Sequence, residues 1–188
     1  MFFNKNYAGV DEVGRGCLAG PVTICALVLE SDCLNDELTD SKKLSPARRE
    51  ELASQIKTIS RYEIISFSSE EIDRYNILRA TLMAMTEALN RLKPERAYID
   101  GNKCPHSIVP CEAIIKGDNF VPAISAASIL AKVTRDRHMV TLSQKYPAYG
   151  FEKHKGYGTQ YHLKALAENG ITPEHRLSFA PVRKVLSV

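Results

Sequence analysis

The stretch "YAGVDEVGRGCLAGPVTICALVL", residues 7–29, predicts two strands joined by a turn. Residues 7–10 form a short apolar run that ends at Asp11 and Glu12, and residues 21–29 form a longer run rich in β-branched side chains. Three glycines between the two runs give the backbone the freedom that a sharp turn requires. The stretch therefore places two adjacent carboxylates at the end of a strand, beside a turn with little side-chain cover.

The rest of the sequence alternates between strand and helix patterns. Ser45 and Pro46 are typical of a helix start, and Pro94 and Gly170 are typical of helix ends. The expected elements are further strands over 61–67, 96–100 and 111–118, and helices over 46–57, 78–92, 122–146 and 159–169 and from 172 onward. This order predicts the α/β class, with a mixed sheet flanked by helices.

Length and composition predict one compact globular domain. The chain has 188 residues, of which 44% are hydrophobic and 25% charged, and no apolar run is long enough to cross a bilayer. The N-terminal residues lack the pattern of a secretory signal, so we expect a cytoplasmic protein with five reduced cysteines. The spacing of Cys104 and Cys111 fits no common zinc pattern. A net charge of +3 permits a polyanionic partner without requiring one.

Carboxylates recur at the ends of predicted strands. An isolated pair such as Asp11 and Glu12 is usually a solvated strand end, but Asp100 and Asp118 also follow apolar runs and lie beside glycines. If the chain bends so that both members of the pair face inward, the four carboxylates form an all-oxygen site suited to Mg²⁺ or Mn²⁺. Such a site predicts phosphodiester hydrolysis. Asp136 is the competing fourth ligand, although the basic residues around it favour ordinary ion pairs on an exposed helix.

Three other segments bear on function, and two of them leave more than one interpretation open. The glycines of residues 14–20 resemble a dinucleotide-binding turn, but such a turn is followed by a helix and here a strand follows. The glycines either let a ligand approach the backbone or simply allow a tight turn. Residues 39–45, "TDSKKLS", suit either phosphate oxygens or a capped surface loop. Residues 151–162 combine basic and aromatic side chains, as nucleic-acid stacking requires. Spacing assigns no catalytic role to His154, His162 or His175.

Taken together, these blocks resemble the ribonuclease HII family. The resemblance is carried by "DEVGRG", "DSKKLS", "YIDGN", "GD" followed by "VPAISAASILAKVTRDR", and "YGFEKHKGYGT", in family order across nearly the whole chain. It implies an RNase H-like fold over residues 1–188, of which roughly 147–188 form a helical C-terminal extension. It also implies a ribonuclease H that cleaves RNA/DNA hybrids and duplex DNA with a single embedded ribonucleotide.

The resemblance further implies roles for individual residues. Asp11, Glu12, Asp100 and Asp118 would form the catalytic site and bind two divalent ions, Mg²⁺ or Mn²⁺, for cleavage on the 5′ side of the ribonucleotide. The products would carry a 3′-hydroxyl and a 5′-phosphate, and the biological role would be removal of ribonucleotides from DNA. The expected substrate contacts are Gly14, Arg15 and Gly16 to the 2′-hydroxyl, Tyr157 to the sugar, and Ser41, Lys42, Ser125 and Ser128 to phosphates.

Two further classes of function stay open from the sequence alone. The same fold without catalysis would be a nucleic-acid-binding module, and the glycine spacing alone would suit a nucleotide-cofactor oxidoreductase. The nuclease accounts for the most features. We expect a monomer with nucleic acid as its partner and no membrane association, and the sequence leaves binding to a sliding clamp open.

Overall fold

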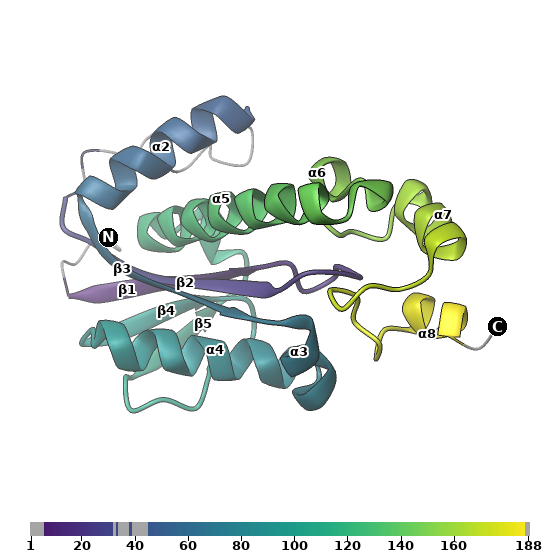
Figure 1. Cartoon of the computed structure of the whole chain (residues 1–188). Coiled ribbons are helices and arrows are strands. Elements are labelled where there is room, and N and C mark those ends of the chain that lie inside the picture. Colours follow the sequence, from purple (N-terminus) through teal and green to yellow (C-terminus); the bar gives the residue numbers. More distant parts are fainter. Residues whose placement is uncertain (1–5, 32, 34–37, 39–44, 187–188) are drawn as a thin grey trace.

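A mixed five-stranded sheet lies between two layers of helices in the computed structural model, which describes residues 6–31, 33, 38 and 45–186 (Figure 1). This architecture confirms the predicted α/β class. In chain order the elements are β1 (Tyr7–Val13), β2 (Val22–Leu29), α2 (Pro46–Thr58), β3 (Ser60–Phe67), α3 (Ser69–Tyr75), α4 (Ile77–Leu92), β4 (Arg96–Asp100), β5 (Cys111–Ile114), η2 (Gly117–Asn119), α5 (Pro122–Lys145), η3 (Pro147–Tyr149), α6 (Phe151–His154), α7 (Gln160–Asn169) and α8 (Ala180–Leu186).

The sheet has the strand order β3-β2-β1-β4-β5. β1, β2 and β3 form an antiparallel meander, whereas β4 runs parallel to β1 and β5 runs parallel to β4. Val10 of β1 pairs with Ile99 of β4, so Asp11 and Asp100 each follow a paired residue at the same edge of the sheet. The parallel pairing is therefore what brings two distant acidic segments together.

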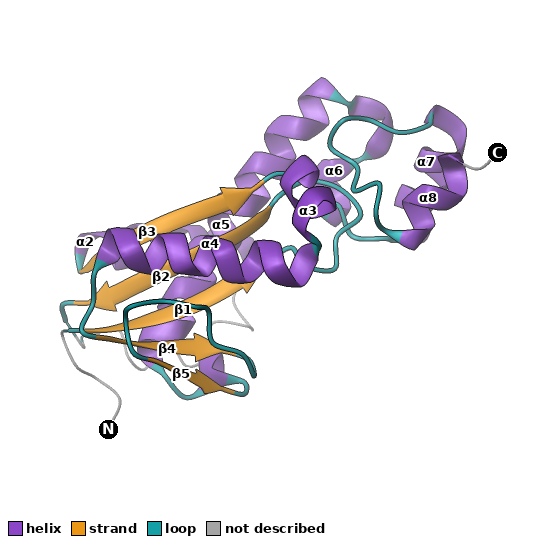
Figure 2. Cartoon of the chain, turned by 90° about the horizontal axis from the view of Figure 1, so that it is seen from below, coloured by secondary structure: helices purple, strands orange, loops and turns teal. Residues whose placement is uncertain are grey.

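Helices cover both faces of the sheet, as Figure 2 shows from below. Every residue of β2 is buried, and alternate residues of this strand belong to two different apolar clusters. One cluster includes the apolar side of α4, and the other includes α2 and α5. A strand buried on both faces explains why residues 22–29 form a nearly continuous apolar run.

Helix α5 lies unusually close to β1 at Gly9. A Cβ atom added at Gly9 would be 2.1 Å from the carbonyl carbon of Ala123 and 2.2 Å from the backbone nitrogen of Ile124. These neighbours are backbone atoms and cannot rotate away. The missing side chain of Gly9 thus sets the distance between the N-terminal turn of α5 and the strand that carries Asp11 and Glu12.

Several element boundaries differ from the sequence-based expectation. β5 ends at Ile114, so Asp118 lies in the 3₁₀ turn η2 and not at a strand end. Residues 172–175 form a turn, and the last helix begins only at Ala180, because the backbone of His175 bridges to Ala19. A short helix, α6, lies within the segment expected to be a loop. Ser45 caps α2 as predicted, its hydroxyl accepting the Arg48 N–H.

The C-terminal helices pack against the loop that follows β1. Leu18 and Ala19 of this loop share an apolar cluster with Met139, Phe151 and Leu166, from α5, α6 and α7. The loop between β1 and β2 is therefore the meeting point of the sheet and the C-terminal segment.

Within the described ranges, no helix is both long enough and apolar enough to span a membrane.

We predict that Gly9→Ala destabilises the protein by about 1–3 kcal/mol or more, since an overpacked backbone contact forces α5 away from β1. Gly16→Ala is the matched control, because a Cβ at Gly16 meets no atom within 4 Å and Gly16 does not have a positive φ. Thermal unfolding of both variants measures the difference. Equal melting temperatures would show that the contact at Gly9 is not restrictive.

Candidate active site

Asp11 and Glu12 leave opposite faces of β1, as consecutive residues of a strand do. Asp11 faces α5, is 6% exposed and forms a hydrogen bond with the side chain of Ser128. Glu12 lies in a pocket beside α4 and forms an ion pair with Arg15 at 3.0 Å. The bend that would turn both carboxylates to one side does not occur at these residues, because β1 remains regular through Val13.

Asp100 connects the two faces electrostatically. Its negative charge raises the pKa of both Asp11 and Glu12. The backbone N–H of Asp118 donates to Asp100 Oδ1 at 3.4 Å, which places η2 at the same edge of the sheet. The structure thus brings together the four segments that carry the predicted carboxylates.

Burial is the main cause of the altered acidity at this edge. Burial, together with the charges of Glu12 and Asp100, raises the pKa of Asp11 to about 8 against the opposing hydrogen bond from Ser128. Burial also raises the pKa of Glu12, with the opposing effect coming from Arg15. Without a cation, the folded protein favours a proton on Asp11.

The residues at this edge fit a hard divalent cation in their chemistry. All the donors are carboxylate oxygens, and the mutual repulsion of Asp11, Glu12 and Asp100 is what a cation would relieve. Among the described residues, however, no three His, Cys, Asp or Glu side chains are already arranged as a metal site. Cation binding would therefore require the carboxylates to converge from the two faces of β1.

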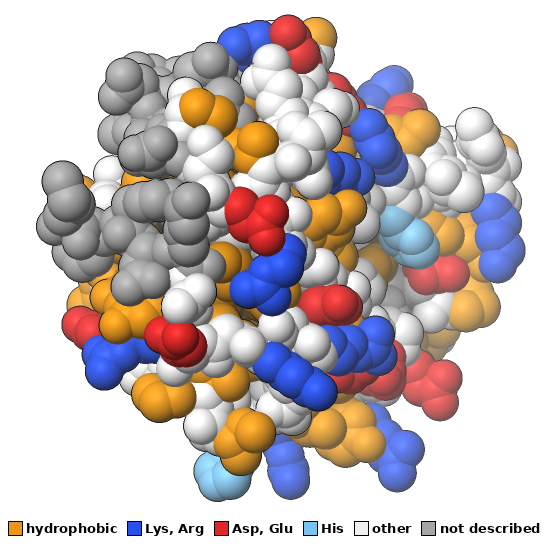
Figure 3. Space-filling view, turned by 90° about the vertical axis from the view of Figure 1, so that its left-hand side faces the viewer, with side chains coloured by type: hydrophobic (Ala, Val, Ile, Leu, Met, Phe, Trp, Pro, Cys, Tyr) orange, Lys and Arg blue, Asp and Glu red, His pale blue; other side chains and the backbone are white. Residues whose placement is uncertain are grey.

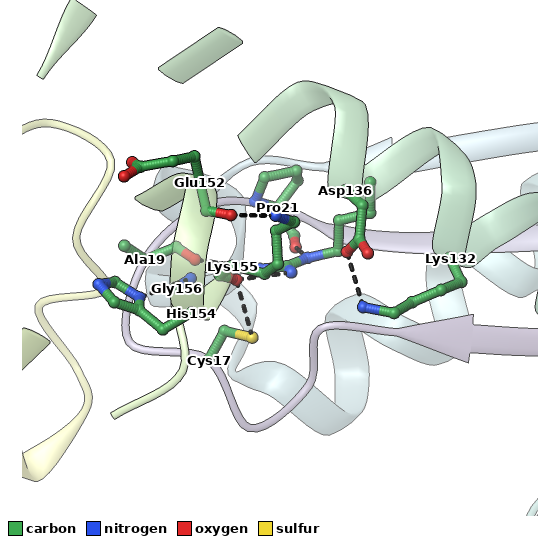
Figure 4. Close-up of polar contacts among 10 residues, drawn as sticks. Cys17, Ala19, Pro21, Lys132, Asp136, Glu152, His154, Lys155 and Gly156 are labelled. Carbon is green, nitrogen blue, oxygen red and sulfur yellow. Dashed lines mark hydrogen bonds and ion pairs between the residues drawn. The ribbon is translucent and has the colours of Figure 1, made fainter. Parts of the chain in front are cut away.

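Asp136 does not belong to this group in the structure. Its carboxylate accepts a hydrogen bond from Lys132, one helical turn earlier in α5, at 2.7 Å (Figure 4). This is the ordinary ion pair that the surrounding basic residues predict.

The turn after β1 leaves backbone exposed next to the carboxylates. Arg15 and Gly16 are exposed, and Arg15 helps to line a pocket of about 200 Å³ together with Glu12 and Asp100. Gly14 has a φ of 92°, and a Cβ there would collide with the Arg135 side chain, whereas a Cβ at Gly16 would meet nothing. Gly14 is therefore needed for folding, while Gly16 leaves space that a ligand can use.

Tyr157 lies beside this turn although it is distant in sequence. Its backbone bridges to Cys17, and its hydroxyl and the Cys17 thiol form a hydrogen bond. The side chain is nevertheless 43% exposed, so part of the ring is available for stacking. Burial of the remainder raises the pKa of the hydroxyl.

The predicted phosphate contacts differ in their surroundings. Ser128 is partly buried and bonded to Asp11, whereas Ser125 is 1% exposed and its hydroxyl donates to the carbonyl oxygen of Leu38. This geometry does not present the Ser125 hydroxyl to a substrate. Ser41 and Lys42 lie outside the described residues.

Two histidines form a buried chain that the sequence did not reveal. The Thr172 N–H donates to His175 Nδ1 at 2.9 Å, His175 Nε2 lies 3.1 Å from His162 Nε2, and His162 Nδ1 lies 2.9 Å from the carbonyl oxygen of Tyr157. These partners require both imidazoles to be neutral. Burial lowers the pKa of His162 and of His175 to about 4, so the chain that holds Tyr157 is intact at neutral pH.

Two buried arginines are the other feature that sequence reasoning missed. Arg135 and Arg176 are both 0% exposed, and the hydrogen bonds that they donate to described residues end on backbone carbonyl oxygens. Arg135 was expected on an exposed helix surface, and that expectation is wrong because α5 is covered there by the loop after β1. No periodicity in the sequence distinguishes these arginines from surface ones.

Comparison with known proteins places the chain among ribonucleases. The sequence matches the model of a protein family described as Ribonuclease HII over residues 8–182. A Ribonuclease HII from Coxiella burnetii (strain Dugway 5J108-111) is 54% identical over 185 residues, covering 97% of this chain and 92% of the relative.

Two solved structures have the same fold. A chain from the PCNA:RNase HII complex of Archaeoglobus fulgidus superposes with a TM-score of 0.82 at 32% identity, covering 92% of this chain and 94% of that one. The ribonuclease H2 from Pyrococcus horikoshii OT3 gives 0.85 at 30% identity, covering 96% and 97%.

We predict that Asp11→Asn stabilises the metal-free protein at pH 8. Because the folded-state pKa of Asp11 is raised from 3.8 to about 8, ionised Asp11 destabilises the fold increasingly as the pH rises through this interval. A gain of about 2 kcal/mol would raise the Tm by roughly 4–8 °C for a chain of this length.

Thermal melts in EDTA at pH 4 and pH 8 measure this effect. The gain should be small at pH 4, where Asp11 is protonated in the folded state and only about half ionised in the unfolded chain. Asp136→Asn serves as the control with a solvent-accessible ion pair. A gain of equal size at both pH values would contradict the assignment of the effect to ionisation of Asp11.

Proposed function

The chain belongs to the ribonuclease HII family and is a ribonuclease H endonuclease, and we propose that it cleaves on the 5′ side of ribonucleotides in RNA/DNA hybrids and in duplex DNA containing single ribonucleotides. The products would carry a 3′-hydroxyl and a 5′-phosphate. The observation that carries the proposal is the position of Arg15 in one pocket with Glu12 and Asp100, next to the exposed Gly16. Recognition of ribose and hydrolysis would then occur on one turn.

The cofactor would be two divalent cations, Mg²⁺ or Mn²⁺, held by Asp11, Glu12, Asp100 and Asp118. Bound there, they would activate the attacking water and stabilise the charge on the attacking and leaving oxygens. The buried position of Asp11 supports this assignment, since a carboxylate with a raised pKa in a group of like charges needs a proton or a cation.

The remaining site residues would orient the substrate. The backbone of Gly14, Arg15 and Gly16 would contact the 2′-hydroxyl, and a site built for that hydroxyl leaves a polar group unpaired when it meets deoxyribose. The exposed part of Tyr157 would stack on the neighbouring sugar. Ser128, together with Ser41 and Lys42 as predicted from the sequence, would contact phosphates.

Charge does not mark the face at which β1 begins as a nucleic-acid site. Figure 3 shows the end of the molecule at which β1 begins, and Lys and Arg side chains alternate there with Asp and Glu. The described residues of this face form no patch of one sign. The proposal therefore places the substrate at the opposite end of β1 and β4, on the grounds of the carboxylates and the glycine turn.

The wider biological assignment follows from the same proposal. We propose one catalytic domain over residues 1–188, with roughly 147–188 as a helical C-terminal extension, acting as a monomer in the cytoplasm to remove ribonucleotides from DNA. The Archaeoglobus fulgidus relative is part of a complex with PCNA, which makes a sliding clamp a candidate partner.

We predict that the protein nicks an end-labelled duplex 5′ of its single ribonucleotide in Mg²⁺ or Mn²⁺, and that EDTA abolishes the cleavage. Asp11→Asn should lower the rate by at least ~10³-fold because it removes an anionic ligand from the centre of the site. Sealing of the nick by a DNA ligase checks for 3′-hydroxyl and 5′-phosphate ends. An all-DNA duplex is the control, and a duplex that is bound but never cut would indicate a binding module instead.

We predict that Gly16→Ala lowers kcat/KM on the single-ribonucleotide duplex by at least ~10-fold, since a methyl group would occupy the space expected for the 2′-hydroxyl. Its Tm should change little, because that methyl group meets no protein atom. Gly14→Ala is the comparison variant and should lower the Tm through its positive φ and its contact with Arg135. Unfolding of Gly16→Ala would show that this glycine serves only the turn.

A further inference from the structure

Residues Gly14–Cys17 form a β-turn whose central peptide joins Arg15 to Gly16. The Cys17 N–H donates to the carbonyl oxygen of Gly14 at 3.4 Å and closes the turn. The two common turn types differ mainly by a flip of the central peptide, and a glycine at the third position permits both. The type II turn needs a positive φ at that residue, and Gly16 lacks one although Gly14 and Gly20 have it. One orientation of the central peptide is therefore selected.

The selecting contact comes from Arg176, near the other end of the chain. Arg176 Nη1 donates to the carbonyl oxygen of Arg15 at 2.9 Å, while Nε and Nη2 donate to that of Gly20 at 3.0 and 2.8 Å. Burial lowers the pKa of the guanidinium to about 10, so it stays protonated at pH 7. No described carboxylate lies within ion-pair distance of it. Its donors are thus committed to the carbonyl oxygens of this loop.

The orientation of the Arg15 carbonyl determines that of the next amide. In a trans peptide the C=O and N–H bonds point in opposite directions, and the described chain has no cis peptide bond. With the Arg15 carbonyl directed inward to Arg176, the Gly16 N–H points outward. Gly16 is exposed, and no described residue accepts its N–H. An unused donor therefore stands beside the carboxylates.

We propose that Arg176 is a positioning residue for ribose recognition: it holds the Arg15–Gly16 peptide so that the Gly16 N–H faces the 2′-oxygen of the substrate. This inference rests on the proposed function, and it adds a residue that touches neither substrate nor metal. Without Arg176, the central peptide can flip to the type II orientation, which turns the donor away.

Arg135 provides a matched control for the purely structural role of a buried arginine. It is as buried as Arg176 and also donates three hydrogen bonds to carbonyl oxygens, those of Ala19, Pro21 and Lys155, three residues that Figure 4 draws together. None of these bonds reaches the Arg15–Gly16 peptide. Loss of Arg135 should weaken the fold without turning that peptide.

The test compares binding of two duplexes, one with a single ribonucleotide and one of DNA alone, in an Asp11→Asn background that prevents cleavage. The quantity measured is the ratio of the two affinities. Adding Arg176→Gln should lower this ratio about 3- to 10-fold, as expected for one hydrogen bond. Adding Arg135→Gln should leave the ratio unchanged even where it lowers the Tm. Arg176→Lys, which can still donate to one carbonyl oxygen, should retain more of the ratio than Arg176→Gln.

Two results would overturn the proposal: an unchanged ratio in Arg176→Gln, or an equal fall in Arg135→Gln. If Arg176→Gln does not fold, the Gly16 amide of the ¹⁵N-labelled Asp11→Asn protein gives an independent measurement. Its proton resonance should shift with the ribonucleotide duplex and not with the DNA duplex; the same shift with both would also overturn the proposal. Failure of the proposed function would be seen separately, as absence of cleavage by the unmutated protein.

Discussion

Hydrogen bonds from two buried guanidinium groups to backbone carbonyl oxygens hold the site together. Arg135 from α5 and Arg176 from the C-terminal segment bind the loop between β1 and β2 at Arg15, Ala19, Gly20 and Pro21. Buried carbonyl oxygens need donors, and an arginine supplies several in a fixed fork. Because the acceptors are neutral, each guanidinium remains a net positive charge beside Cys17 of this loop. The loop is thereby fixed in shape without consuming an acidic residue that the site requires.

The sheet and the loop contribute different parts of the same site. Parallel pairing of β1 with β4 aligns Asp11 with Asp100, and the strand's alternation sends Asp11 and Glu12 to opposite faces. The loop then presents exposed backbone where the strand ends. The regular strand holds Asp11 and Glu12 apart, and burial together with the charges of Glu12 and Asp100 makes Asp11 a weak acid.

Local patterns were enough to predict the fold class and most of the helices and strands. Three of these features depend only on residues that are close together in the sequence: the β-branched run of β2, the Ser45 cap and the amphipathic pattern of α4. Tertiary packing did not override them. Contacts between distant segments could not be predicted in the same way. The turn at residues 172–175 forms because His175 pairs with Ala19, and the burial of Arg135 and His162 depends on what covers them. The sequence predicted that the acidic segments meet at one edge of the sheet. It did not predict that Asp11 and Glu12 point to opposite faces of β1.

The contact between Arg176 and Arg15 has a consequence for protein synthesis. The two residues are 161 positions apart, so a ribosome makes the turn long before it makes the arginine that orients it. The carboxylates of β1 and β4 also precede Arg176 in the chain. A nascent chain can therefore form its sheet before its ribose-recognition turn is fixed, and discrimination between RNA and DNA would be among the last properties the folding chain acquires.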